Sequence, residues 1–226
     1  MTSQRHLIDT PTELSAAFHA EAVLDEVTLE AILELNLDFL RLLERRHRAQ
    51  PTRSCAGLGP ATLARLCALA PLARRRLAAC PYTLFDMRFA DVAFWSAPAL
   101  TPEAEGDTVD TVPIAIGFAQ VAAFFAWHIA RGDALTAALV LGMDPLTHAT
   151  WRTLSLASLA ERASLALSAL SARFIPCPGF WSALIADAVS PGQMDVQATR
   201  LQGLQLLAAT RIDASHRGRS RDLRSR

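Results

Sequence analysis

Residues 35–59 read LNLDFLRLLERRHRAQPTRSCAGLG, and a similar stretch returns at residues 118–142, FAQVAAFFAWHIARGDALTAALVLG. Both stretches span 25 residues and end in Leu-Gly, and Pro60 and Pro145 follow them. The next landmarks recur at offsets of 85 and 86 residues: Arg88-Phe89 with Arg173-Phe174, and Phe94-Trp95 with Phe180-Trp181. These recurrences indicate an internal repeat.

The spacing of apolar residues predicts helices and no confident strand. The longest helix is expected from Thr28 to His47, with early glutamates and late arginines that complement the helix dipole. In each copy, Leu-Gly is expected to close a helix, because glycine accepts the left-handed C-cap conformation. A proline then opens the next helix, where its missing N–H does no harm.

One short helical unit cannot bury its wide apolar faces alone, whereas two copies can bury them against each other. We therefore expect an all-α protein in which two duplicated units pack as a pseudo-dimer, preceded by an N-terminal helical arm. The expected divisions are an acidic arm (1–34), a first unit (35–97), an acidic linker (98–112), a second unit (113–212) and a flexible basic tail (213–226).

Charge alternates along the chain although it cancels overall. The 226 residues hold 22 basic residues, all arginine, and 22 acidic ones, which excludes a uniformly basic nucleic-acid coat. Residues 41–88 hold ten arginines and two acids (+8), and residues 162–226 hold nine arginines and four acids (+5). These basic blocks could face phosphate or pair with the acidic blocks of the same chain.

Several other classes of protein find little support. The four cysteines form no CxxC pair, so we expect small buried thiols in a cytoplasmic protein, with no metal and no cofactor. We find no phosphate-binding glycine loop, nucleophile elbow or HExxH motif, and we expect no enzyme. Thr111–Ala130 is uncharged and long enough to span a bilayer, but its helical stripe is typical of a buried core helix, so we expect no membrane association.

The repeat resembles the FlhD family of bacterial flagellar transcriptional regulators. The residues that carry the resemblance are LNLDFLRLLERR from Leu35, the Leu58-Gly59 stop, and Leu69–Phe89 (LAPLARRRLAACPYTLFDMRF). The second copy is similar around Asp133–Ala137 and in a trailing helix near Ala198–Ile212. The resemblance implies an all-helical dimer that acts on promoter DNA with an FlhC-like partner subunit. The chain departs from that family in its two copies, acidic arm and basic tail, and in the missing trailing helix of the first copy.

The candidate DNA-binding residues belong to the first basic block. Arg74, Arg75 and Arg76 follow Pro71, and Arg65 lies on the preceding helix. Consecutive helical residues are turned about 100° apart, so two of the three arginines could reach phosphates while Leu72 and Leu77 face the core. A merely solvated helix face is the alternative. The tail adds Arg217, Arg219 and Arg221, which would supply affinity independent of DNA sequence, or would serve only as a solubilising end.

The second copy is a weaker DNA surface, because Glu161 stands between Arg152 and Arg162. Its aromatic landmarks, like those of the first copy, are expected to be core residues, with partner hot spots as the alternative. The expected function is a transcriptional regulator, or a subunit of one, that binds promoter DNA or docks a DNA-binding partner. The alternatives are a protein–protein adaptor or anti-regulator that does not bind DNA, and a helical enzyme whose site assembles only in three dimensions.

Overall fold

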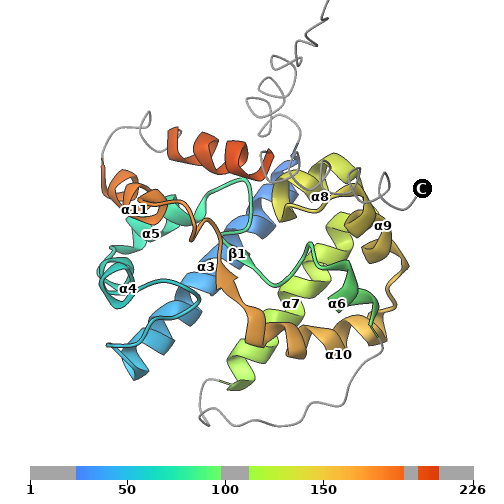
Figure 1. Ribbon diagram of the computed structural model, residues 1–226. Coiled ribbons are helices and arrows are strands. Elements are labelled where there is room, and N and C mark those ends of the chain that lie inside the picture. Colours follow the sequence, from blue (N-terminus) through green and yellow to red (C-terminus); the bar gives the residue numbers. More distant parts are fainter. Residues whose placement is uncertain (1–23, 98–111, 191–197, 209–226) are drawn as a thin grey trace, which may run out of the picture.

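The computed structural model describes residues 24–97, 112–190 and 198–208 (Figure 1). Its helices are α3 (Glu26–Ala49), α4 (Pro60–Cys67), α5 (Pro71–Ala78), α6 (Val92–Ser96), α7 (Val112–Arg131), α8 (Ala134–Leu141), α9 (Pro145–Thr153), α10 (Leu156–Ala166), the 3-10 turn η1 (Leu167–Ala169) and α11 (Phe180–Val189), followed by a helix at residues 198–208. The predicted all-α class is confirmed. Residues 1–23 of the expected arm, residues 98–111 of the expected linker and the whole expected tail (213–226) lie outside the described residues.

Helix α3 begins and ends close to the predicted positions. Asp25 caps it, because its carboxylate accepts a hydrogen bond from the Thr28 amide at 2.6 Å. Its apolar stripe is buried and includes Ile32, Leu35 and Phe39. The helix continues without a break across residues 34 and 35, where the arm was expected to end and the first unit to begin.

The Leu-Gly prediction is confirmed in the second copy and wrong in the first. Gly142 closes α8 in the left-handed conformation, with φ of 69°. Gly59 instead has φ of −71° and is the N-cap of α4. The reason is that no helix precedes it: Cys55 and Leu58 exchange backbone hydrogen bonds of 3.0 and 2.9 Å in a turn. The helix starts at Pro60, Pro71 and Pro145 are confirmed.

One face of helix α7 is buried in the core of the protein. It is the one helix among the described residues that is long and apolar enough to cross a membrane, from Pro113 to Arg131. Its buried face consists of Ala115, Phe118, Ala119, Ala122, Ala123, Ala126, Ile129 and Ala130. This face packs on α3, α9 and α10, which is the packing of a core helix.

A short antiparallel strand pair, absent from the sequence prediction, joins the two halves of the sequence. In β1 (Phe85–Asp86) and β2 (Ser171–Ala172), Phe85 lies opposite Ala172 and Asp86 opposite Ser171. Beside the pair, the buried Arg173 guanidinium donates from Nε to the Phe85 carbonyl at 3.0 Å and from Nη2 to the Leu141 carbonyl. Burial lowers the pKa of Arg173, while the nearby Asp86 carboxylate opposes that effect.

Beyond the strands, each half of the sequence places a short helix on the other half. Helix α6 packs on α9, and α11 packs on α4 and α5 (Figure 1). In both places an indole N–H donates to an arginine backbone carbonyl: Trp95 to Arg88 at 2.7 Å, and Trp181 to Arg173 at 2.8 Å. The Arg-Phe and Phe-Trp landmarks therefore make the same kind of contact in both halves.

Aromatic rings fill the space between the halves. The Phe39 and Phe118 rings, from α3 and α7, lie 6.2 Å apart, and Phe85 contacts both of them. The Trp95 and Trp151 rings lie 4.2 Å apart. Among the landmarks, Phe89, Trp95, Phe180 and Trp181 are buried, and Phe94 and Phe174 pack half-buried against the core, which confirms the core interpretation.

Asn36 holds the chain segment that follows α5. Its side-chain amide donates to the carbonyls of Ala78 (3.0 Å) and Tyr82 (2.9 Å), and its carbonyl accepts from the Leu84 amide (2.8 Å). The Tyr82 ring then reaches the helix of residues 198–208. A Cβ at Gly203 would overlap that ring, so only glycine permits this approach.

Candidate nucleic-acid interface

Helices α4 and α5 both pack on α3 and present the predicted arginines. Their buried residues are Leu63 and Leu66 in α4, and Ala73, Leu77 and Ala78 in α5. Arg65, Arg75 and Arg76 are exposed. The expectation that Leu72 faces the core is wrong, because its side chain is 63% exposed in the first turn of α5.

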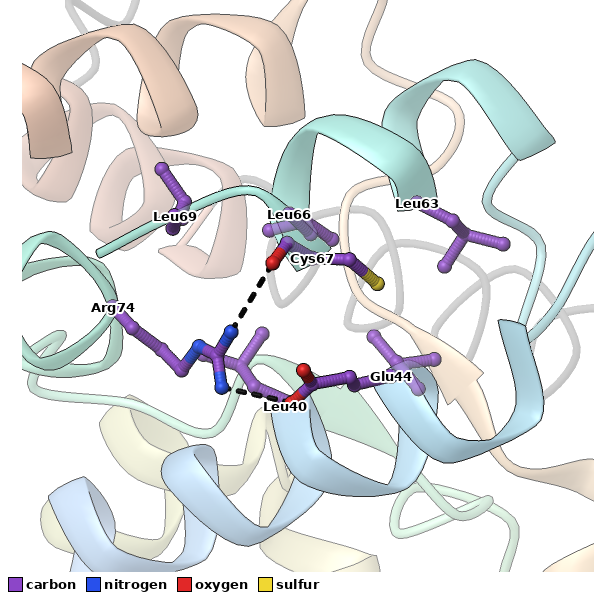
Figure 2. Close-up of a pocket in the computed structure, with 8 residues that line it drawn as sticks. Leu40, Glu44, Leu63, Leu66, Cys67, Leu69 and Arg74 are labelled. Atoms are coloured by element: carbon purple, nitrogen blue, oxygen red, sulfur yellow. Dashed lines mark hydrogen bonds and ion pairs between the residues drawn. The ribbon is translucent and has the colours of Figure 1, made fainter. Parts of the chain in front are cut away.

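Arg74 is turned toward the protein (Figure 2). Its Nη1 lies 2.8 Å from Glu44 Oε2, and its Nη2 is 3.5 Å from the Cys67 carbonyl. The second Glu44 oxygen pairs with Arg48 Nη2 at 2.6 Å. Arg74 is only 23% exposed and Glu44 only 14%. Arg74 therefore links α5 to α3, and it is poorly placed to contact a phosphate.

The ion pair closes a very small cavity of about 10 Å³ between α3, α4 and α5. Leucines and the Cys67 side chain line the remainder of it (Figure 2). Burial and the Glu44 carboxylate raise the pKa of the Cys67 thiol, with the Arg74 guanidinium acting in the opposite direction. The thiol therefore stays protonated at neutral pH, which makes it a poor nucleophile and metal ligand.

A further arginine, which sequence reasoning missed, joins this surface. Arg200 donates from Nη2 to the Arg76 carbonyl at 3.1 Å, and Arg76 donates to the Ser190 carbonyl at 3.5 Å. The cations of Arg75, Arg76 and Arg200 thus gather where α5 ends and where its dipole is negative. Arg200 is a single cation in an apolar helix, so only the tertiary fold reveals its place beside α5.

The corresponding surface of the second half is less basic. Arg152 is exposed on α9, whereas Arg162 is buried in α10 and donates to the Phe94 carbonyl of α6. Glu161 is exposed beside it. Among these corresponding helices, α4 and α5 therefore present three exposed arginines (Arg65, Arg75 and Arg76), whereas α9 and α10 present one (Arg152).

An open cavity of about 440 Å³ lies between α6, α9 and α10, and its lining is more polar than that of the small cavity beside Arg74. Its hydroxyl groups serve local structure: Thr150 donates to the Leu146 carbonyl, Thr153 donates to the Thr150 carbonyl, and Ser158 bonds Ser155. No nucleophile lies against a base in this lining. Within residues 24–97, 112–190 and 198–208, no three His, Cys, Asp or Glu side chains gather as a metal site would require.

The tail arginines Arg217, Arg219 and Arg221 lie outside the described residues. Of the predicted set, the structure brings Arg75 and Arg76 together on α5, adds Arg65 on the neighbouring α4, and engages Arg74 with Glu44. No known protein family, curated protein or solved structure matches the chain.

Proposed function

We propose that this chain is a regulator of transcription that binds DNA through the exposed arginines of α4 and α5. It is built from two FlhD-like units that pack as a dimer within one chain. The first unit contains α3, α4, α5, β1 and α6. The second contains α7 to α10, β2, α11 and the helix of residues 198–208.

Three observations support the duplicated arrangement. Helix α3 packs on α4 and α5 as α7 packs on α9 and α10. The antiparallel β1–β2 pair is the pairing that a twofold axis produces between two copies of one strand. Each unit also places its Phe-Trp helix on the other.

The excess of exposed arginines on α4 and α5 over the corresponding helices α9 and α10 carries the proposal of DNA binding. The Arg65 and Arg75 side chains make no hydrogen bond or ion pair to any described residue, so their guanidinium groups are available for phosphate. Arginine is suited to this contact because its planar donors match phosphate oxygens. Contacts of this kind position a protein on DNA and give affinity without specifying a sequence.

The test is binding of the full chain to a fluorescent duplex, measured by anisotropy across a range of salt concentrations. The slope of log K against log salt changes by about 0.9 for each phosphate contact. Arg65→Ala with Arg75→Ala is therefore expected to weaken binding and to reduce the slope by about 1.8. Arg152→Ala, which removes an exposed arginine from the second unit, is the matched control and is expected to change neither quantity.

Absence of binding at low salt, or equal losses in the double variant and the control, would contradict the proposed surface. Arg74→Ala is unsuitable as a probe, because it leaves Glu44 half-paired in a partly buried site. A loss of affinity in that variant would report on the packing of α5 as much as on DNA.

The second candidate function, a protein–protein adaptor, is favoured by a groove on the same side. Leu37, Leu69 and Pro71 form its apolar floor between Arg41 and Arg75, with a volume of about 430 Å³. Such a floor suits an apolar side chain of a protein partner, an FlhC-like subunit among them. The adaptor function is the better account if the chain does not bind DNA but binds a partner protein in a complex that withstands nuclease treatment and that Leu37→Glu disrupts.

A further inference from the structure

The outer face of α7 is apolar and uncovered by the described residues. Ile114 is 49% exposed, Val121 57% and Phe124 39%, and the exposed His128 continues the same face one turn later. From Pro113 to Ala130 this helix contains no Asp, Glu, Lys or Arg. An outward helix face is normally polar, so this one calls for a covering element.

The chain enters the described structure at the His128 end of that face. Helices α3 and α7 pack together, and Phe39 lies against Phe118 at 6.2 Å. At the other end of this contact, hydrogen bonding by Thr28 is the main cause of the lowered pKa of Asp25, and the His128 imidazole is close enough to that carboxyl group to add to it. The two helices therefore run antiparallel, and the described chain begins, at Leu24, at the His128 end of α7.

The sequence of the segment that precedes Leu24 fits the uncovered face. Thr10-Pro11-Thr12-Glu13 has the sequence pattern of a helix start, and Leu14, Ala17, Phe18 and Glu21 follow at the spacing of one helix face. Seven residues separate Leu14 from Glu21, as seven separate Val121 from His128. Each interval is about 10 Å long in a helix. A helix that turns back from α3 over a short loop would run parallel to α7 in this register.

We propose that residues 10–22 form a helix that docks on the outer face of α7. Leu14, Ala17 and Phe18 cover Val121 and Phe124, and the Glu21 carboxylate lies against His128. The covalent connection at residue 24 holds the segment at an effective concentration in the millimolar range, which favours it over a separate partner. This docking is independent of the DNA-binding proposal.

Hydrogen exchange of the full-length chain, followed by mass spectrometry, tests the docking. In the unaltered protein, the amides of residues 13–22 are expected to exchange about tenfold or more slowly than in a free peptide of the same sequence. Val121→Glu places a charge in the centre of the face and is expected to abolish that protection. Leu72→Glu, which alters an equally exposed leucine on α5, is the matched control and is expected to preserve it.

Circular dichroism of both variants checks that the fold is intact, and Phe18→Glu is a second variant that leaves α7 unchanged. The docking is wrong if residues 13–22 exchange like the free peptide, or if their protection survives both Val121→Glu and Phe18→Glu. It is also wrong if α7 is protected only in a dimer whose population rises with concentration. Protection of α7 that appears only on vesicles of phosphatidylcholine and phosphatidylglycerol would instead identify a bilayer as the occupant.

Discussion

Replacing Asn36 with alanine tests how the first unit is held together. The change removes three hydrogen bonds, and it leaves the Ala78 carbonyl, the Tyr82 carbonyl and the Leu84 amide without partners. All three residues are fully buried. Each orphaned buried group costs about 1 to 3 kcal/mol, so we expect Asn36→Ala to lower the free energy of unfolding by about 3 to 9 kcal/mol. Domains of this kind have only about 5 to 15 kcal/mol in total.

Urea unfolding followed by tryptophan fluorescence measures this difference. Asp38→Ala is the control, because Asp38 lies two residues further along α3 and makes an exposed pair with Arg41 at 2.6 Å. Exposed pairs of this kind contribute about 0 to 1 kcal/mol, so the control is expected to unfold almost like the unaltered protein. If Asn36→Ala loses less than about 1 kcal/mol, water or a local rearrangement satisfies the backbone groups and the reasoning fails.

Three further predictions concern the same core. Gly203→Ala is expected to destabilise the protein by about 1 to 3 kcal/mol, because the new methyl group overlaps Tyr82; in a double-mutant cycle with Tyr82→Ala, purely additive effects would contradict the overlap. Burial raises the pKa of the Cys80 thiol to about 11, above its ordinary 9.0. The contribution of this thiol to the free energy of unfolding is therefore complete below pH 9 and falls by about 2 to 3 kcal/mol as the pH rises toward 11. Cys80→Ala should flatten the pH dependence of the stability measured in urea between pH 9 and 10, and an unchanged slope would refute this. Trp95→Phe and Trp181→Phe each remove one indole hydrogen bond to an arginine carbonyl and are expected to cost similar amounts, about 1 to 2 kcal/mol; thermal melts that differ severalfold would argue against equivalent units.

The sequence predicts those parts of the fold that depend on local chemistry. Helix α3 follows from its apolar stripe, and the starts of α4 and α9 follow from Pro60 and Pro145, because a proline is tolerated in the first turn whatever lies elsewhere. Gly59 shows the limit of this reasoning. The same Leu-Gly pair ends a helix at Gly142 and starts one at Gly59, since the preceding residues form a helix in one copy and a turn in the other.

The candidate interface depends on contacts that are distant in the sequence. Arg74, Arg75 and Arg76 look equivalent when read in order, but Glu44, 30 residues earlier, pairs with the first of them. Leu72 is exposed because α5 directs Ala73 and Leu77 into the core instead. The strands were missed because two residues are too few to show an alternating pattern.

Because α6 and α11 each pack on the other half of the sequence, neither half is expected to fold completely when it is produced alone. Neither half of the sequence supplies all the packing for its own helices, since α6 rests on α9 and α11 rests on α4 and α5. A chain divided between residues 97 and 112 keeps every one of these contacts, so two separately encoded fragments, 1–97 and 112–226, are expected to recombine when produced together. Each fragment produced alone would expose the apolar surface that the other fragment covers in the intact protein. Reassembly of the two fragments therefore tests directly whether the contacts between the halves hold the fold together.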